Sequence, residues 1–198
     1  MPLIDIINID SNTSLGIWQI DENTTPEAFC PQQVCQQLQY MCVSRQKETA
    51  AIYALLRTIT NRNDLVIGHE TCGRPFVDGY NIGISHTKGF ACLILSNSKN
   101  VAVDIEYTSS RIARIKDKFL RPDEEANTIE SLLLHWCAKE TIYKYYSDNT
   151  LALTDIRVIK AALCYAENTI LCENMHNNKM LKITYHINTN FTLTYCCE

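Results

Sequence analysis

Two acidic residues, Asp104 and Glu106, occupy alternate positions in a stretch with the pattern of a β-strand, residues 101–106. Two valines and an isoleucine fill the positions between, which is typical of a strand buried on one face. Successive side chains of a strand point to opposite faces, so the two carboxylates are predicted to share one face. Taken alone, such a pair is more typical of a solvated strand end than of a binding site.

A second stretch, residues 136–144, has the pattern of an α-helix with further ionisable groups. Helical residues four apart lie one turn above each other, so Trp136, Glu140 and Lys144 are predicted to form one stripe, with Lys139 beside it. A glutamate and a lysine at this spacing also form ordinary surface ion pairs. Trp136 is expected to anchor the helix in the core.

Packing this helix across the strand would bring three carboxylates to one point: Asp104, Glu106 and Glu140. Three clustered carboxylates repel one another strongly unless a cation lies between them. Oxygen ligands suit a hard divalent ion, and magnesium keeps room for the oxygens of a phosphate. The neighbouring lysines favour a polyanionic substrate. The sequence therefore predicts a site for a metal ion and a phosphate.

The order and spacing of these motifs resemble the signature of the 4'-phosphopantetheinyl transferases. The resemblance rests on Asp-x-Glu at residues 104–106, followed after a few tens of residues by Trp-x-x-Lys-Glu-x-x-x-Lys at residues 136–144. It extends upstream to Gly-Arg-Pro at residues 73–75 and to Ile-Ser-His at residues 84–86, and covers residues 45–144 in all. The chain length is similar to that of the long, single-chain, surfactin-type branch.

Two departures from the family pattern are visible. Ala102 stands where the family usually has glycine before the Asp-x-Glu, and Arg74 replaces the more common lysine. Neither change removes a metal ligand, and arginine can bind phosphate as lysine does.

The resemblance implies a role for each motif residue. The magnesium ligands would be Asp104, Glu106 and Glu140, with Lys144 near the pyrophosphate of coenzyme A and Lys139 beside the ligands. Asp104, Glu140 and Lys144 would be the catalytic residues. The proton acceptor for the attacking serine stays open between Glu140 and a water bound to the metal.

The upstream motifs are implied to bind the nucleotide of coenzyme A. His86 and Arg45 would contact its 3'-phosphate, although a surface charge near a helix start explains Arg45 equally well. Ser85 would also contact coenzyme A. The turn formed by Gly73, Arg74 and Pro75 would line the adenosine pocket.

The fold is expected to be α+β. Long members of the family consist of two similar α+β halves about a pseudo-twofold axis, so we expect an N-terminal half at residues 1–100 and a C-terminal half at residues 101–198, with the active site in the cleft between them. Strands are predicted near the start of the chain, through residues 65–106 and from residue 155 onward. Helices are predicted at residues 25–41, 45–60, 109–119 and 131–146, with another starting at residues 121–125.

The composition of the chain argues against several classes of protein. The chain has 198 residues, 46% hydrophobic content and a net charge of -4, which fits a globular protein and disfavours a nucleic-acid binder. No apolar run approaches a membrane span, and the first ten residues lack signal-peptide features. The ten cysteines include no Cys-x-x-Cys and are interpreted as reduced thiols. We expect a cytoplasmic monomer.

The function implied by the resemblance is transfer of 4'-phosphopantetheine from coenzyme A to a serine of an apo acyl or peptidyl carrier protein, that is, a holo-[acyl-carrier-protein] synthase with Mg²⁺. There are two alternatives to this function. One is a metal-dependent phosphodiesterase or nuclease, but the lysine expected after Asp…Glu-x is missing, since Tyr107 and Thr108 follow Glu106. The other is a non-catalytic module that binds coenzyme A or a carrier, which would be expected to have lost a ligand.

A cluster of basic residues follows the strand motif and is a candidate docking site for the acidic carrier. On an α-helix, Arg111, Arg114 and Lys118 would recur at i, i+3 and i+7 and share a face. The short trimeric branch of the family has a similar arginine-bearing helix that docks its carrier. A solvated helix face is the simpler alternative.

Overall fold

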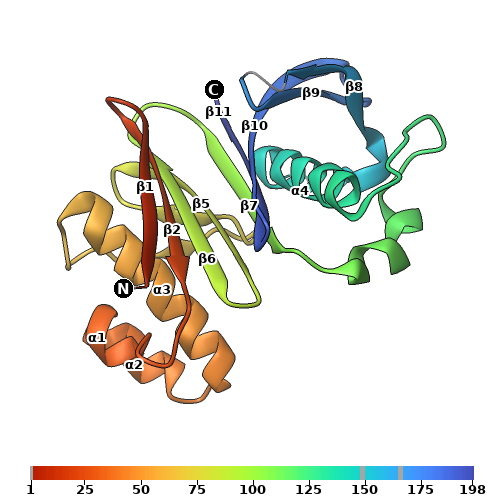
Figure 1. Cartoon of the computed structure of the whole chain (residues 1–198). Coiled ribbons are helices and arrows are strands. Elements are labelled where there is room, and N and C mark those ends of the chain that lie inside the picture. Colours follow the sequence, from red (N-terminus) through yellow and green to blue (C-terminus); the bar gives the residue numbers. More distant parts are fainter. Residues whose placement is uncertain (1, 148–149, 165–166) are drawn as a thin grey trace. The chain divides into compact units, whose positions relative to one another are not determined.

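The computed structural model describes residues 2–147, 150–164 and 167–198. It divides the chain into two compact units, Met1–Asn100 and Val101–Glu198. Each unit combines one antiparallel sheet with helices, so the α+β prediction is confirmed (Figure 1). No helix in the described part of the chain is long and apolar enough to cross a membrane.

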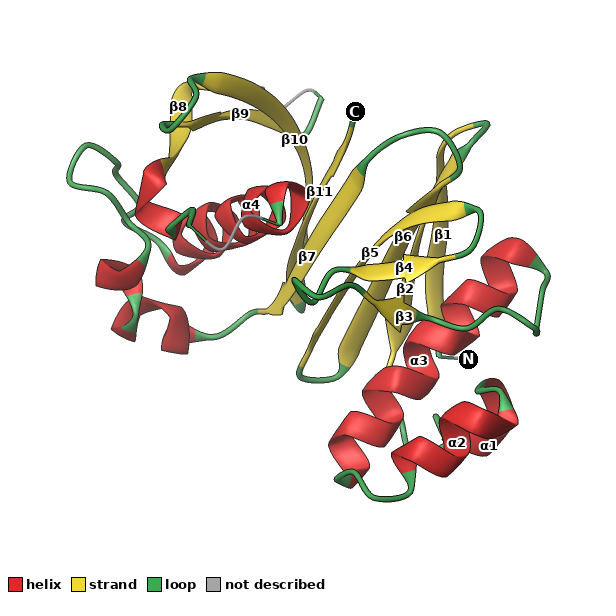
Figure 2. Cartoon of the chain, turned by 180° about the vertical axis from the view of Figure 1, so that it is seen from behind, coloured by secondary structure: helices red, strands yellow, loops and turns green. Residues whose placement is uncertain are grey.

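The sheet of the N-terminal unit has six antiparallel strands in the order β1-β2-β6-β5-β4-β3. Figure 2 shows the short strands β3 and β4 beside β5. The predicted strand at residues 65–68 is shorter and starts later than expected, because only two residues pair with β4. The strands are β1 (Leu3–Asp10), β2 (Thr13–Gln19), β3 (Gly68–His69), β4 (Pro75–Val77), β5 (Tyr80–Thr87) and β6 (Phe90–Ser96).

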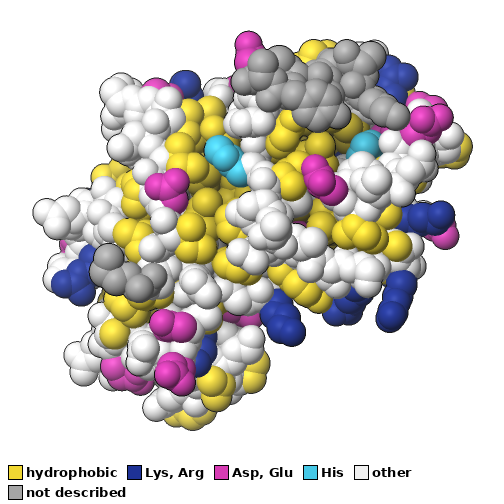
Figure 3. Space-filling model, in the orientation of Figure 1, with side chains coloured by type: hydrophobic (Ala, Val, Ile, Leu, Met, Phe, Trp, Pro, Cys, Tyr) yellow, Lys and Arg dark blue, Asp and Glu magenta, His cyan; other side chains and the backbone are white. Residues whose placement is uncertain are grey.

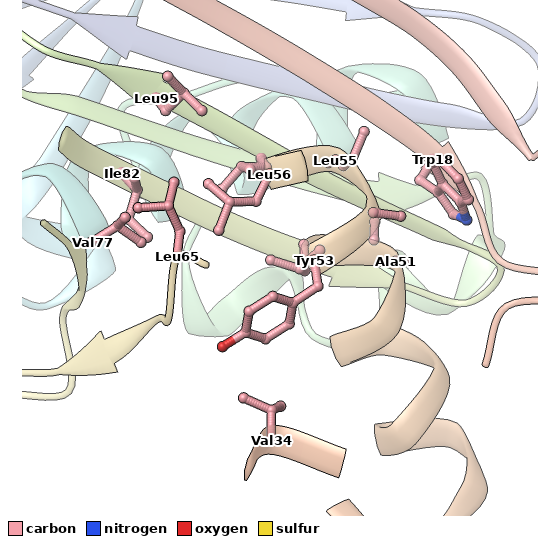
Figure 4. Packing of buried hydrophobic residues seen from close by; sticks show 14 of the residues in the cluster. Trp18, Val34, Ala51, Tyr53, Leu55, Leu56, Leu65, Val77, Ile82 and Leu95 are labelled. Atoms are coloured by element: carbon pink, nitrogen blue, oxygen red, sulfur yellow. The ribbon is translucent and has the colours of Figure 1, made fainter. Parts of the chain in front are cut away.

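Three helices accompany this sheet: α1 (Pro26–Phe29), α2 (Gln32–Leu38) and α3 (Val43–Thr60). Pro31 separates the first two, since it is the N-cap residue of the second one. α3 packs on β2 and β6, and its buried residues form the core shown in Figure 4. Gly16 on β2 permits this close packing, since a Cβ atom there would lie 2.7 Å from Cδ2 of Leu55.

The C-terminal unit consists of a five-stranded antiparallel sheet and one long helix, α4 (Ile129–Tyr146). Figures 1 and 2 show the sheet curling around α4. The strand order is β7-β11-β10-β9-β8. The strands are β7 (Val101–Tyr107), β8 (Ile156–Cys164), β9 (Thr169–Asn174), β10 (Lys179–Ile187) and β11 (Phe191–Cys197).

The segment between β7 and α4 differs from the prediction. The expected single helix at residues 109–119 is wrong: the structure has two short 3-10 helices, η1 (Ser110–Arg114) and η2 (Lys116–Lys118). The helix expected to start at residues 121–125 is also absent among the described residues, where a turn is found. The carboxylate of Glu124 explains the turn, because it accepts a hydrogen bond from the backbone N–H of Arg121 at 2.9 Å.

Candidate active site

Helix α4 begins and ends at local signals in the sequence. Thr128 and Ser131 form a reciprocal capping box, in which the hydroxyl of each accepts from the backbone N–H of the other at 3.1 Å. Ser147 ends the helix in the left-handed conformation, with φ of 50°. These signals fix which residues are helical and therefore which side chains face the sheet.

Two side chains of α4 set its position over β11. The hydroxyl of Thr141 lies 2.6 Å from that of Thr194, and the thiol of Cys137 donates to the carbonyl oxygen of Thr192 at 3.7 Å. Thr194 and Thr192 are the residues of β11 that pair with Asp104 and Glu106 on β7. The helix is thus held directly above the part of the sheet that carries the two acids.

Lys144, at the end of the same helix, reaches Asp104. Its Nζ lies 2.7 Å from Oδ1 of Asp104 and donates a second hydrogen bond to the carbonyl oxygen of Val103 at 3.3 Å. Asp104 is only 4% exposed, so this ion pair is partly shielded from water. The structure therefore joins two of the residues that the sequence motif singled out.

Glu140 lies in the same electrostatic environment. Burial, followed by the negative charges of Asp104 and Glu106, raises the pKa of Glu140 from 4.5 to about 7, while Lys144 acts in the opposite direction. The pKa of Cys137 is also raised, by burial first and then by the same two aspartate and glutamate charges. Asp104 and Glu106 therefore both lie close enough to Glu140 to repel its charged form.

The donor set suits a hard divalent cation, because all three side chains offer oxygen and their repulsion would be relieved by positive charge. Within the described residues, however, no group of three or more His, Cys, Asp or Glu side chains is arranged to hold a metal ion. The ammonium group of Lys144 supplies the positive charge beside Asp104 instead. The residues fit magnesium in their chemistry and charge, not as a preformed cage.

Lys139 has other partners in this structure than the motif implies. The motif placed it beside the metal ligands, in contact with coenzyme A, but its side chain is fully buried. Its Nζ donates to Glu124 and to the carbonyl oxygen of Phe119, both at 2.7 Å. Burial lowers the pKa of Lys139, and the bond to Glu124 opposes that change. The side chain of Lys139 thus forms hydrogen bonds within the interior of the C-terminal unit.

A comparison with known proteins relates one part of the chain to a family. The family model described as the 4'-phosphopantetheinyl transferase superfamily matches residues 100–196, which include β7 and α4. The C-terminal unit of the chain therefore matches this superfamily. No curated protein matches the sequence significantly. The matched range contains Asp104, Glu106, Glu140 and Lys144, whereas the upstream motifs lie outside it.

Within the N-terminal unit, two predicted phosphate-binding residues lie together. Nη1 of Arg45, in the first turn of α3, lies 2.7 Å from Nε2 of His86 on β5. Arginine can only donate, so Nε2 accepts and the proton of a neutral imidazole is on Nδ1. Nδ1 faces Oε2 of Glu48 at 3.4 Å. The arrangement gives a partly exposed cationic group with one acid beside it.

Glu48 was not identified from the sequence as part of this group. The sequence could have indicated this contact, because Glu48 follows Arg45 by three residues on a helix and residues at i and i+3 are neighbours on a helix surface. Nη1 of Arg45 and Oε2 of Glu48 lie 3.4 Å apart. Glu48 therefore offsets the positive charge when no anion is bound.

The other upstream motif residues lie on neighbouring strands of the same sheet. Ser85 precedes His86 on β5 and is buried. Gly73 and Arg74 form the turn before Pro75, which starts β4, and Gly73 adopts a φ of 87° that favours glycine. β4 pairs with β5, so the turn belongs to the strand pair that carries Ser85 and His86.

The segment between β7 and α4, residues 109–121, is strongly basic, and we call it the basic segment. Arg111, Arg114 and Lys118 are exposed, whereas Ile112 and Phe119 are buried. Figure 3 shows Lys and Arg side chains gathered along this edge of the C-terminal unit. In a 3-10 helix residues three apart lie on one side, so Arg111 and Arg114 share a face, while Lys118 belongs to the next short helix.

A groove of about 410 Å³ runs between the basic segment, the end of β7 and α4. Glu106 and Trp136 line it together with Arg111, Ile112 and Lys118. Trp136 is held by an edge-to-face contact with Phe119, with ring centroids 5.3 Å apart. Trp136 is only partly buried: it packs against the small core cluster that includes Phe119 and also lines the groove. The groove brings basic side chains to the same place as one of the three acids.

The raised pKa of Glu140 predicts how pH affects the metal-free protein. Glu140 keeps its proton up to about pH 7 when folded but releases it near 4.5 when unfolded. The folded state therefore binds more protons between these values, and stability falls as pH rises through this window. In chelator, wild type should lose up to roughly 3 kcal/mol relative to Glu140→Gln between pH 5 and pH 8. Urea unfolding at both pH values measures this, and parallel profiles for the two proteins would contradict the placement of Glu140.

Proposed function

We propose that the protein transfers the 4'-phosphopantetheine group of coenzyme A to a serine of an apo carrier protein. The products are the holo carrier and adenosine 3',5'-bisphosphate. The observation that supports this is the cluster of Asp104, Glu106, Glu140 and Lys144, which the matched superfamily range contains. We also place the chain in the long, single-chain branch of the superfamily, on its length and motif order.

In this proposal Asp104, Glu106 and Glu140 hold Mg²⁺. The ion, when bound, supplies positive charge that stabilises the leaving phosphate. Lys144 already neutralises Asp104, so a divalent ion and the ammonium compete for that carboxylate. A lysine released from Asp104 is a donor for the pyrophosphate, where added positive charge lowers the barrier to phosphoryl transfer.

We propose that the nucleotide binds through residues of the N-terminal unit. Arg45 and His86 offer donors from adjacent side chains, which suits the dianionic 3'-phosphate of coenzyme A. Protonation of His86 on phosphate binding would make both its ring nitrogens donors. Ser85 and the turn at residues 73–75 complete this part of the proposal, as contacts to the rest of the nucleotide.

The basic segment is the proposed docking site of the carrier. The whole chain has a net charge of -4, so an acidic carrier needs a local basic surface for attraction. Arg111, Arg114 and Lys118 provide one, and two of them line the groove beside Glu106. This places the attractive surface next to the proposed metal ligands.

Reversing the charge of two exposed arginines should weaken carrier capture selectively. We expect Arg111→Glu with Arg114→Glu to raise the carrier KM about tenfold at low salt and to flatten its salt dependence, because long-range attraction is screened by salt. Coenzyme A affinity should stay unchanged. Arg62→Glu, at an exposed position in the N-terminal unit, serves as the control. An unchanged carrier KM in the double variant would place docking elsewhere.

Titration with coenzyme A, with and without magnesium, separates this function from its alternatives when followed by a turnover assay. The transferase should bind coenzyme A more tightly with magnesium and then consume it only when a carrier is present. A binding module would bind without turnover. A phosphodiesterase would cleave coenzyme A with no carrier, and that result would replace the proposed function.

A further inference from the structure

The ion pair between Lys139 and Glu124 is the most completely buried charged pair among the described residues. The two side chains are 0% and 1% exposed, and Nζ and Oε2 are 2.7 Å apart. Lysine and glutamate are almost never buried this fully unless they are paired. A buried pair also needs its other donors and acceptors to be bonded, because desolvation otherwise outweighs the attraction.

The remaining bonds of this pair tie several elements together. Lys139, on α4, also donates to the carbonyl oxygen of Phe119, just after η2. The carboxylate of Glu124 accepts from the backbone N–H of Arg121 at 2.9 Å and from that of Val158, on β8, at 2.7 Å. One lysine and one glutamate thus connect the end of the basic segment to the long helix and to the sheet.

The basic segment depends on such connections, because its own secondary structure is weak. Its two 3-10 helices have five and three residues, and 3-10 helices have poor hydrogen-bond geometry. Its buried side chains, Ile112 and Phe119, belong to a small cluster that also includes Ala126 and Leu132. The charged side chains of residues 111, 114 and 116–118 are exposed, whereas Arg121, at the end of the segment, is partly buried and donates to the carbonyl oxygen of Thr154 at 2.6 Å.

We propose that Lys139 and Glu124 are positioning residues, which hold the basic segment against α4 so that the groove beside Glu106 keeps its shape. Neither residue contacts a substrate. Consecutive residues of an α-helix point about 100° apart, so Lys139 and Glu140 face different surroundings from one helix. α4 therefore carries Glu140 and, through this ion pair, also holds the basic segment in place. The part that concerns the carrier rests on the proposed function.

Limited digestion with trypsin tests the positioning role without any assay of activity. The basic segment contains four cleavage sites, Arg111, Arg114, Lys116 and Lys118, because Pro122 protects the bond after Arg121. In Lys139→Met and in Glu124→Gln, cleavage within the segment should be at least about tenfold faster than in wild type, since proteolysis under native conditions follows local opening. Cleavage within the segment at the wild-type rate in both variants would overturn the proposal.

A control is needed for general loss of stability. Leu181→Ala opens a cavity in the core between sheet and helix without removing either charge of this pair or any of its hydrogen bonds, and should lower the melting temperature. Compared at equal distance below each melting temperature, Leu181→Ala should not accelerate cleavage in the segment as the other two do. Equal acceleration would show that the ion pair contributes only to global stability.

The double variant, Lys139→Met with Glu124→Gln, separates charge burial from positioning. Removing both charges leaves no unpaired charge in the interior, so its melting temperature should lie above those of the single variants. The connection to Phe119 is still lost, so cleavage of the segment should remain fast. If protection of the segment returns together with the melting temperature, the pair is not a positioning device.

The kinetic expectation is a change in the carrier KM alone. In the two single variants we expect the carrier KM to rise about tenfold, with coenzyme A affinity within about twofold of wild type. An equal loss of coenzyme A affinity would mean that Lys139 acts on the nucleotide after all. If wild type transfers nothing to any carrier, the proposed function fails, and the digestion result still decides the structural role.

Discussion

Replacing Glu140 by glutamine is expected to reduce phosphopantetheine transfer by about a thousandfold or more in kcat/KM. The substitution keeps the size of the side chain but removes one of three carboxylates that together would hold the metal ion. Loss of a single group that stabilises charge in a transition state typically costs a hundred- to a thousandfold, and loss of a metal ligand costs at least as much. Initial rates at saturating coenzyme A and magnesium measure the effect.

The matched control for this variant is Glu130→Gln. Glu130 lies on the same helix but is exposed, and it is not among the charges that shift the pKa of Glu140. Its replacement should leave turnover within about twofold of wild type. Asp104→Ala should behave like Glu140→Gln, with the fold intact by circular dichroism. Near wild-type transfer by either variant at saturating magnesium would contradict the proposed metal site.

The second large effect concerns the 3'-phosphate of coenzyme A. His86→Ala should weaken binding of coenzyme A by roughly 10- to 150-fold, because a charge-assisted hydrogen bond contributes about 1.5–3 kcal/mol. Binding of dephospho-coenzyme A should change little, since the two ligands differ only in that phosphate. Isothermal titration of both ligands measures the difference.

Glu48→Gln is the control for His86→Ala. It removes the acid beside Arg45 and His86 without removing a donor. Coenzyme A should bind this variant at least as tightly as wild type, because one repulsive charge is lost. Equal losses of both ligands in His86→Ala would show that His86 does not contact the 3'-phosphate.

The metal-site motif could be predicted from sequence because its residues obey simple periodicities. Asp104 and Glu106 alternate along β7, and Glu140 and Lys144 are one turn apart on α4. The sequence pattern did not predict which other strand holds α4 in position. The hydrogen bonds from Thr141 and Cys137 to β11 place the helix above the acids, and they join residues more than fifty positions apart.

Lys139 makes contacts that the sequence pattern did not predict. Its position next to Glu140 suggested a shared role, but adjacent residues on a helix point in different directions. Its partner, Glu124, lies in a turn fifteen residues earlier, and no periodic pattern connects the two. The same glutamate also explains why residues 121–125 form a turn, since its carboxylate is held by contacts with α4 and β8.

The basic segment illustrates a different failure. The spacing of Ile112, Ile115 and Phe119 fits an α-helix, and the division into buried and exposed residues was largely right. The backbone nevertheless forms two 3-10 helices, with Ser109 accepting from the backbone N–H of Arg111. Apolar spacing over about eleven residues does not distinguish these geometries, because residues at i and i+3 are neighbours in both.

The most direct test of the central claim is mass spectrometry of apo carrier proteins after incubation with the protein, coenzyme A and magnesium. Carriers from fatty-acid, polyketide, peptide-synthetase and siderophore pathways form the panel. The account predicts that at least one carrier gains a single phosphopantetheine group on its serine, that adenosine 3',5'-bisphosphate appears in equal amount, and that Glu140→Gln gives neither product. Release of adenosine 3',5'-bisphosphate without any carrier, or no mass gain on any carrier in the panel while coenzyme A binds, would contradict it.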